Sequence, residues 1–178
     1  IVYESLTTPR RIIDVDLDTG DRTLVRETPV LGGYDSEDYV SERAWAVAGD
    51  GTRVPVSLVR HRGTPLPAPL LLYGYGAYEI PTDPWFSHAR ISLLERGVVF
   101  AIAHVRGGGE LGKRWYEDGK LAAKENTFDD FVAAAEHLVR AGFTTPERLA
   151  ARGGSAGGLL MGAVVTRRPD LFAAVVAE

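Results

Sequence analysis

In the first sixty residues, apolar and polar positions alternate in the way that is typical of β-hairpins. Four segments alternate as strands with turn residues between them: 10–16, 23–30, 44–48 and 53–60. Residues 31–35 interrupt the alternation as a linker, and Asp50-Gly51 is a strong hairpin turn signal between the last two strands. The sequence therefore predicts two hairpins joined by a linker.

Beyond residue 65 the pattern changes to buried strand, loop and helix, repeated along the chain. Strands are predicted at four segments: 70–73, 98–105, 148–152 and 171–177. The segment 98–105 is a continuous apolar strand of the kind that is buried on both faces of a parallel sheet. Helical spacing of apolar residues occupies three: 87–96, 127–141 and 154–167. Thr127 is expected to cap the second helix and Gly142 to end it. The alternation predicts an α/β fold with a mostly parallel sheet and flanking helices.

Composition narrows the class of protein. The 178 residues are 45% apolar and 25% charged, as in an ordinary soluble globular domain, alone or with a piece of another. The formal net charge is −4 and the cationic residues are scattered, so we expect no nucleic-acid partner. The apolar runs are far shorter than the roughly 20 residues that span a membrane, so we expect no membrane partner. The absence of Cys excludes disulfides and cysteine-ligated metal sites and is compatible with the cytoplasm, where we place the protein.

The two ends of the sequence differ from those of a typical domain. The chain starts at Ile1 without a signal-like segment, and it stops inside the apolar run 171–178 without a turn residue. Domain boundaries are usually polar and flexible. We therefore interpret the sequence as a fragment of a longer polypeptide.

The pattern Gly153-x-Ser155-x-Gly157 lies between a predicted strand and a predicted helix. This is the context of a nucleophile elbow, in which glycines allow a sharp, strained turn that exposes a serine hydroxyl. The following helix directs its free N–H groups at the site, so the N–H of Ala156 is a candidate donor to an oxyanion. The alternative is a flexible glycine-rich turn or helix cap. The flanking strand and helix favour Ser155 as a catalytic nucleophile.

A serine nucleophile needs a histidine base, which the sequence does not place where the α/β-hydrolase order requires it. In that order the acid and the histidine follow the serine, but the 23 residues after Ser155 contain no His. All four histidines lie upstream: His61, His88, His104 and His137. We expect His104 to be a packed residue that makes one hydrogen bond, and His137 to lie on the surface. The fragment is therefore expected to lack the triad Asp and His, to need the remainder of the polypeptide and to be inactive alone.

Several further motifs occur in a fixed order along the chain. They are Leu71-Leu72-Tyr73-Gly74-Tyr75-Gly76-Ala77-Tyr78, Val105-Arg106-Gly107-Gly108-Gly109-Glu110, Trp115-Tyr116-Glu117-Asp118-Gly119-Lys120, Asn126-Thr127-Phe128-Asp129-Asp130 and Arg168-Pro169-Asp170-Leu171-Phe172. With the elbow, they resemble the prolyl oligopeptidase family of serine peptidases from about Gly33 to the end. Ala156 after the serine, where prolyl oligopeptidases typically have Asn, is most similar to the oligopeptidase B (protease II) branch.

The resemblance implies a fold, a reaction and the roles of individual residues. Residues 1–32 would be the end of a β-propeller and a linker, and residues 33–178 the truncated N-terminal part of an α/β-hydrolase catalytic domain. The enzyme would cleave short peptides after Arg or Lys through an acyl-enzyme on Ser155, without a cofactor or metal. Tyr75 would donate its hydroxyl to the oxyanion together with the N–H of Ala156.

The resemblance also implies one contact with the substrate. Asp83 lies where the oligopeptidase B branch places acidic residues near a basic substrate side chain, although an exposed loop aspartate is the alternative. The branch has a second Asp two positions on, where this sequence has Trp85. This change either weakens one basic-residue contact or replaces it with a cation–π surface. The acidic residues that would bind the Arg or Lys before the cleaved bond are expected beyond Glu178.

Other functions are weighed against this one. Residues 106–109 could suggest a phosphate-binding loop, but no Gly-Lys-Ser/Thr follows, and we interpret them as a constrained turn over the site. The acidic residues of 115–120 include no His that would indicate a metal site. The remaining alternatives are a prolyl oligopeptidase, an acylaminoacyl peptidase or an esterase on the same scaffold, or an inert fragment.

Overall fold

The computed structural model describes residues 1–178, which form nine strands and four α-helices. The strands are β1 (Val2–Tyr3), β2 (Arg11–Val15), β3 (Arg22–Glu27), β4 (Tyr39–Val47), β5 (Arg53–His61), β6 (Leu70–Tyr73), β7 (Val99–Ala103), β8 (Leu149–Gly153) and β9 (Ala174–Ala177). The helices are α1 (His88–Leu94), α2 (Lys113–Glu117), α3 (Glu125–Arg140) and α4 (Ala156–Arg167). Short 3₁₀ turns occupy Ser36–Asp38, Leu121–Ala123 and Pro146–Arg148.

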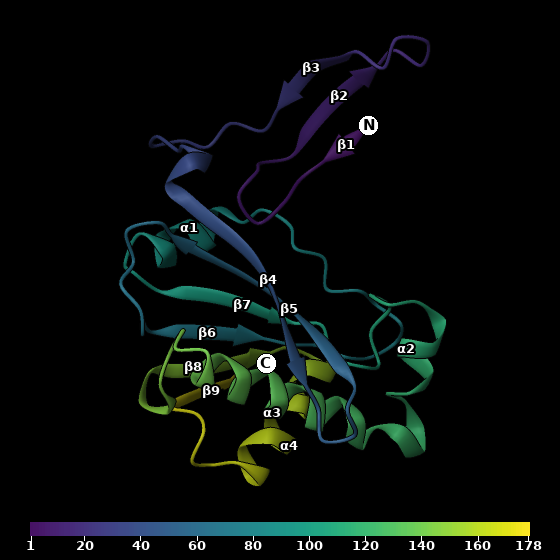
Figure 1. Ribbon diagram of the computed structural model, residues 1–178, viewed down its shortest axis with the longest axis vertical. Helices are drawn as coiled ribbons and strands as arrows, with labels where there is room; N and C mark the ends of the chain where they lie inside the picture. Colours follow the sequence, from purple (N-terminus) through teal and green to yellow (C-terminus); the bar gives the residue numbers. More distant parts are fainter.

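The strands form two separate sheets. A small antiparallel sheet has the order β1-β2-β3, and Figure 1 shows it standing apart from the larger one. The larger sheet has six strands in the order β4-β5-β7-β6-β8-β9. Its β7, β6, β8 and β9 run parallel, whereas the β4–β5 hairpin is joined antiparallel to β7. The expected mostly parallel sheet is therefore a mixed sheet, because the second hairpin extends it at one edge.

Helices cover both faces of the larger sheet. Successive residues of β7 pack on opposite faces of the sheet. Ala101 lies in a core of 26 residues with side chains of α3 and α4. Phe100 and Ile102 lie on the other face, in a cluster with Leu94 of α1. Strand side chains point to opposite faces in turn, so a strand that is apolar at every position needs cover on both sides. The three-layer α/β arrangement follows from this pattern and is visible in Figure 1.

One side chain from the N-terminal segment reaches the larger domain. Leu6, in the loop between β1 and β2, is 2% exposed and belongs to the same cluster as Tyr39, Phe100 and Ile102. The hydroxyl of Tyr34 also donates to the carbonyl of Thr7 at 2.6 Å. The small sheet is therefore attached through an apolar contact and a hydrogen bond as well as through the linker.

Three local expectations are corrected by the structure. Helix α3 begins at Glu125, and Thr127 does not cap it, because its hydroxyl donates to the carbonyls of Arg106 (2.7 Å) and Gly119 (3.1 Å). Strand β9 begins three residues later than expected, since Leu171 and its neighbour pack as a buried loop. Helix α2 was not expected, because its five residues are too few to show a periodic pattern.

No helix is long and apolar enough to cross a membrane.

Candidate active site

The candidate site lies where several parallel strands end. Tyr75 follows β6, His104 follows β7 and Ser155 follows β8, and these three strands are parallel neighbours in the sheet. The carboxyl ends of parallel strands meet at one edge, which is where α/β folds place their ligand sites. The order of the strands thus brings to one edge residues that are 80 positions apart in the sequence.

Ser155 occupies a strained turn between β8 and α4. Its φ of 56° and ψ of −117° lie in a region that residues with a side chain rarely adopt, and its side chain is exposed. The glycines around it have a steric role: a Cβ on Gly153 would lie 2.4 Å from the carbonyl oxygen of Gly157. The strand–turn–helix context predicted for the elbow is therefore present.

The end of the chain holds this turn in place. The N–H of Ser155 donates to the carbonyl of Glu178 at 2.7 Å, and the N–H of Glu178 donates to the carbonyl of Gly153 at 3.1 Å. The side chain of Glu178 also pairs with Arg152, the penultimate residue of β8, at 2.9 Å. These contacts fix the backbone on both sides of the serine, so that the strained turn is supported by its neighbours.

One N–H group beside Ser155 is suited to binding an oxyanion. Ala156 is the first residue of α4, and no hydrogen bond within the chain occupies its N–H. At a helix N-terminus such an N–H favours negative charge. The backbone of Tyr75 passes alongside the same turn: a Cβ on Gly157 would lie 2.7 Å from the carbonyl oxygen of Gly74 and 3.5 Å from the Cα of Tyr75. The structure thus places the backbone of Tyr75 beside the turn that carries Ser155 and Ala156.

Asp83 lies in the loop between β6 and α1 and is exposed. With Trp85, it lines a shallow hollow of about 340 Å³ opposite Val2 and Tyr3 of β1. No hydrogen bond or ion pair joins Asp83 to the elbow. Trp85 also borders a second hollow of about 240 Å³ that is lined by Tyr73 and Arg152, residues at the ends of β6 and β8. The loop that carries Asp83 therefore approaches the carboxyl edge through Trp85.

The glycine-rich segment 106–109 is a constrained turn, as expected. A Cβ on Gly107 would lie 2.2 Å from the carbonyl oxygen of Gly76, and one on Gly109 would lie 2.4 Å from that of Glu79. The turn therefore packs directly on the segment that follows Tyr75. Such close backbone contacts are possible only where the side chain is absent.

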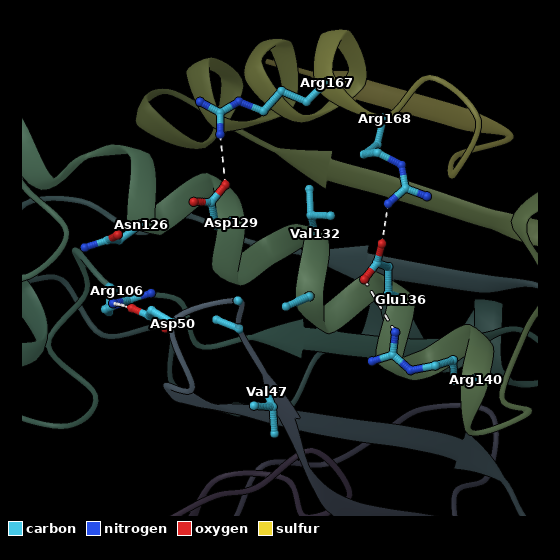
Figure 2. A pocket seen from close by; sticks show the side chains of 13 residues that line it. Val47, Asp50, Arg106, Asn126, Asp129, Val132, Glu136, Arg140, Arg167 and Arg168 are labelled. Carbon is cyan, nitrogen blue, oxygen red and sulfur yellow. Dashed lines mark hydrogen bonds and ion pairs between the residues drawn. The ribbon is translucent and has the colours of Figure 1, made fainter.

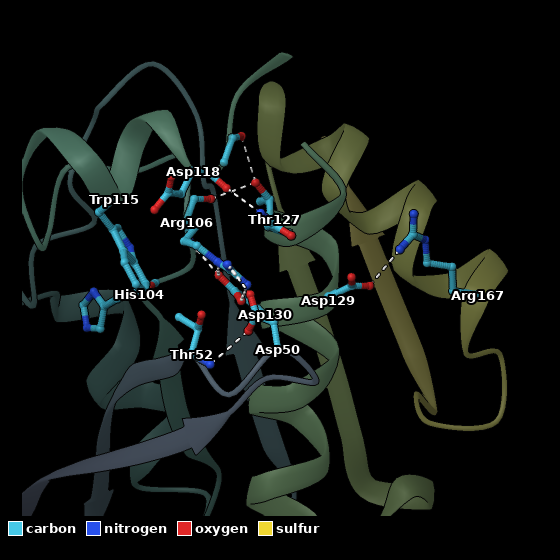
Figure 3. A network of polar contacts seen from close by, with 12 residues as sticks. Asp50, Thr52, His104, Arg106, Trp115, Asp118, Thr127, Asp129, Asp130 and Arg167 are labelled. Atoms are coloured by element: carbon cyan, nitrogen blue, oxygen red, sulfur yellow. Dashed lines mark hydrogen bonds and ion pairs between the residues drawn. The ribbon is translucent and has the colours of Figure 1, made fainter. Parts of the chain in front are cut away.

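Arg106 anchors this turn from below (Figure 3). Its guanidinium is buried, donates to both carboxylate oxygens of Asp130 at 2.9 and 2.6 Å, and donates to Asp50 at 2.6 Å. Burial raises the pKa of Asp130, and the guanidinium opposes this shift. Hydrogen bonds from the backbone of Thr52 and from Arg106 lower the pKa of Asp50 to about 2. The cation is fully paired, so it is not free to bind a phosphate.

A hollow of about 540 Å³ lies apart from the elbow, between the β4–β5 turn and helices α3 and α4. Figure 2 shows that its charged residues face one another: Arg167 pairs with Asp129 at 2.9 Å and Arg140 with Glu136 at 3.4 Å. Each of these cations has an acidic partner. The hollow is therefore lined by a surface network of ion pairs, in which Glu136 is shared by Arg140 and Arg168.

None of the four histidines forms a hydrogen bond with Ser155. His61 and His88 pack edge-on against Tyr39 and Phe86, and burial lowers the pKa of His137. His104 is 2% exposed, and its Nε2 lies 2.8 Å from the hydroxyl of Ser57, as expected of a packed histidine. No cluster of three His, Cys, Asp or Glu side chains is arranged to hold a metal ion.

Two residues that shape this edge were missed in the sequence. Asp130 is fully buried on the apolar face of α3, and Glu110 contacts both His104 and the loop before Asp83. A charged residue within an apolar helix stripe is a sequence signal for a buried partner, and Asp130 provides it. Glu110 gave no such signal, because it lies in a glycine-rich loop without periodicity.

Comparisons with known proteins find relatives in sequence and in overall structure. The model of the prolyl oligopeptidase family matches residues 84–178. "Protease 2" of Moraxella lacunata is 48% identical over 178 residues, and "Dipeptidyl aminopeptidase BI" of Pseudoxanthomonas mexicana is 48% identical over 177 residues. The solved structure of oligopeptidase B from Leishmania major superimposes with a TM-score of 0.92 at 50% identity and covers 98% of the chain.

The matched chains are much longer. The present chain covers 26% of the Moraxella protein, 24% of the Pseudoxanthomonas protein and 25% of the Leishmania structure. It therefore spans about a quarter of the length of these relatives.

Proposed function

This chain belongs to the prolyl oligopeptidase family, and from that premise we propose that it is the nucleophile-bearing part of a serine peptidase of the oligopeptidase B type. The proposed enzyme cleaves short peptides after Arg or Lys and forms an acyl-enzyme on Ser155. The observation that carries the proposal is the backbone of Ser155, held at a φ of 56° at the head of α4 beside Tyr75. An exposed hydroxyl on a strained strand–helix turn is the arrangement of an acyl-transfer nucleophile.

The chemistry assigned to this edge is a nucleophilic attack. The Oγ of Ser155 attacks the carbonyl carbon of the peptide, and a histidine base accepts the hydroxyl proton. The N–H of Ala156 and the hydroxyl of Tyr75 donate to the oxygen as it gains negative charge. As the C–N bond breaks, the protonated histidine gives its proton to the leaving amine, and the acyl group stays on Ser155 as an ester. The histidine then takes a proton from a water molecule that attacks this ester, and the acid is released as the proton returns to the Oγ of Ser155. Donors that are already oriented need no rearrangement during the reaction, which is why they lower its barrier.

We assign the base and its orienting acid to residues outside this chain. The support is that no histidine of the chain forms a hydrogen bond with Ser155 and that the relatives are about four times as long. In the same proposal, residues 1–32 are the end of a β-propeller and a linker, and residues 33–178 begin the catalytic domain. The isolated chain is then inactive, and the proposed location of the enzyme is the cytoplasm.

Asp83 is the proposed contact for a basic side chain of the substrate. It is exposed and lies in a hollow beside Trp85, whose side chain is 41% exposed. A carboxylate and an aromatic face together attract a guanidinium through charge and cation–π interaction. Trp85 therefore supplies the second contact that an aspartate makes in the oligopeptidase B pattern.

The test compares fluorogenic peptides that differ only in Arg or Pro before the cleaved bond, using the full-length protein. We expect cleavage after Arg, lost in Ser155→Ala, and no turnover by residues 1–178 alone. Preference for Pro would retain Ser155 and Tyr75 but would contradict the basic specificity. Turnover by the isolated chain that is sensitive to Ser155→Ala would contradict the assignment of the base to the remainder.

One comparison favours a second candidate function. "Dipeptidyl aminopeptidase BI" is as similar to this chain as "Protease 2" is, at 48% identity. By analogy with its name, the enzyme would then release dipeptides from a free N-terminus. Peptides of the same sequence with a free or an acetylated N-terminus distinguish the two: an endopeptidase cleaves both, whereas a dipeptidyl aminopeptidase cleaves only the free one.

A further inference from the structure

A buried polar cluster lies beneath the loop that carries Asp83. The Oγ of Ser57 lies 2.8 Å from the Nε2 of His104, and the Nδ1 of His104 lies 3.6 Å from the Oε1 of Glu110. Ser57 is 3% exposed and His104 is 2% exposed. The cluster has the residue types of a catalytic triad, but it cannot act as one because a substrate cannot reach a serine in the middle of β5.

The hydrogen-bond partners determine how this cluster is protonated. The Nδ1 of His104 has no hydrogen-bond partner, and neither does the Oε2 of Glu110. If the Ser57 hydroxyl donates to Nε2, the imidazole proton is on Nδ1 and faces the Glu110 carboxylate. This tautomer places a positive N–H dipole opposite a negative group and leaves no lone pair facing the carboxylate. The Nδ1 of His104 then borders the Oε1 of Glu110 at 3.6 Å without forming a hydrogen bond to it.

Glu110 also contacts the loop that carries Asp83. Its Oε1 accepts the N–H of Thr82 at 2.9 Å, and Thr82 directly precedes Asp83. The space for the carboxylate exists only because position 108 is glycine: a Cβ there would lie 2.2 Å from the Oε2 of Glu110. No other hydrogen bond occupies the N–H of Thr82, whose side chain is buried. The carboxylate is therefore the only hydrogen-bond acceptor of this N–H, whereas the other end of the loop is held by Arg90, which donates to the carbonyl of Trp85 at 2.7 Å.

We propose that Glu110, oriented by the buried His104, is a positioning residue that fixes the Thr82–Trp85 loop and thereby the binding of a basic substrate side chain. The part that concerns the substrate rests on the proposed function, whereas the part that concerns the loop does not. A hydrogen bond to a carboxylate is stronger than one between neutral groups, so its loss loosens the loop more than the loss of an ordinary contact would.

The first measurement is amide hydrogen exchange in the full-length protein. Between Pro81 and Pro84 only Thr82 and Asp83 carry amide hydrogens, so one short peptide reports on this contact. Glu110→Ala is expected to speed exchange there about tenfold, because it removes the acceptor. Glu110→Gln retains an oxygen acceptor and is expected to retain the protection. Unchanged exchange in Glu110→Ala overturns the proposal.

A matched control lies on the same loop. Glu79 pairs with Lys113 at 2.8 Å on the surface, and Glu79→Ala is expected to leave the exchange of Thr82 unchanged. Equal effects of Glu79→Ala and Glu110→Ala would overturn the proposal, since any carboxylate of the loop would then act alike. If Glu110→Ala does not fold, Glu110→Asp replaces it, because its side chain is one methylene shorter and the carboxylate is withdrawn from Thr82.

The second measurement separates the loop from the reaction. For a peptide with two adjacent Arg residues, Glu110→Ala is expected to raise KM about tenfold, or about 1.4 kcal/mol, with kcat within about twofold. Glu110→Ala should cause no further rise in KM when Asp83 is already replaced by Ala, because both changes remove the contact of Asp83 with the basic substrate side chain. Faster exchange without a rise in KM, or an undiminished increment in Asp83→Ala, overturns the link to the substrate. If Asp83→Ala alone leaves KM unchanged, the proposed role of Asp83 fails, and hydrogen exchange still decides the role of Glu110.

Discussion

Two glycines of α4 allow a matched test of the elbow. Gly157 is the second residue of the helix and Gly162 lies in its middle. Helix propensity alone predicts that alanine stabilises the helix, most clearly at Gly162 in the interior, by up to about 1 kcal/mol. We expect opposite outcomes, because the surroundings of the two positions differ.

The expected loss of stability and of rate follows from the space that an alanine Cβ would find at each position. A Cβ on Gly157 would lie 2.7 Å from the carbonyl oxygen of Gly74, whereas ordinary contact begins at 3.4 Å, so the two segments must separate by about 0.7 Å. A forced contact of this kind lowers the free energy of unfolding by about 1–3 kcal/mol. The shift also moves Tyr75 away from Ser155, and a displacement of about 1 Å costs up to about 100-fold in rate. A Cβ on Gly162 would meet nothing within 4 Å.

The assay measures the melting temperature and kcat/KM on an Arg peptide for both variants in the full-length protein. Gly157→Ala is expected to lower both quantities, with the rate falling by about one to two orders of magnitude. Gly162→Ala is expected to leave the rate unchanged and to raise the melting temperature slightly. If Gly157→Ala behaves like Gly162→Ala, the close contact between the elbow and the Tyr75 segment is wrong. Equal losses of rate and melting temperature in both variants would show that the effect does not depend on the contact between Gly157 and Gly74.

Three further changes test the site and its support. Tyr75→Phe removes one proposed oxyanion donor and is expected to lower kcat by about 10²–10³ with little change in KM; in steady-state kinetics, a rise in KM alone would contradict that role. Ser155→Gly is expected to abolish hydrolysis and yet to have a higher melting temperature than Ser155→Ala. The reason is that only glycine adopts a φ of 56° freely, and backbone strain of this kind lowers the free energy of unfolding by about 1–3 kcal/mol. A lower melting temperature in Ser155→Gly would contradict the strain. Asp50 has a pKa of about 2 against an ordinary 3.8, so its carboxylate stabilises the fold above about pH 4, and this contribution is lost as the pH falls toward 2. Asp50→Asn should therefore flatten the acid side of the stability profile over that window, and an unchanged acid limb in urea unfolding would refute this.

The elbow could be predicted from the sequence because its determinants are local. Gly153, Ser155 and Gly157 lie within five positions, and the flanking strand and helix have apolar patterns of their own. The β4–β5 hairpin was predictable for the same reason, since Asp50-Gly51 marks its turn. Turns and elements that are determined by residues close together in the sequence can be predicted from the sequence.

Thr127 shows where local reasoning fails. A threonine before an apolar helical run is typical of an N-cap, but a more distant contact competes for its hydroxyl. The carbonyl of Arg106, 21 positions earlier, accepts that hydroxyl, and the helix begins before Thr127. Nothing in the local pattern indicates this partner, because the partner is brought near only by the packing of α3 on the sheet.

The sequence by itself determined the α/β class, most of the segments that form strands and helices, and the serine turn, because these depend on the period of apolar positions and on glycine. Only the tertiary structure decided the strand order and, with it, which residues meet at the carboxyl edge. Tyr75 and Ser155 are 80 positions apart, and Thr82 and Glu110, which share a hydrogen bond, are 28 positions apart. Such contacts depend on the pairing of β6 with β7 and β8, a long-range choice that no local period encodes.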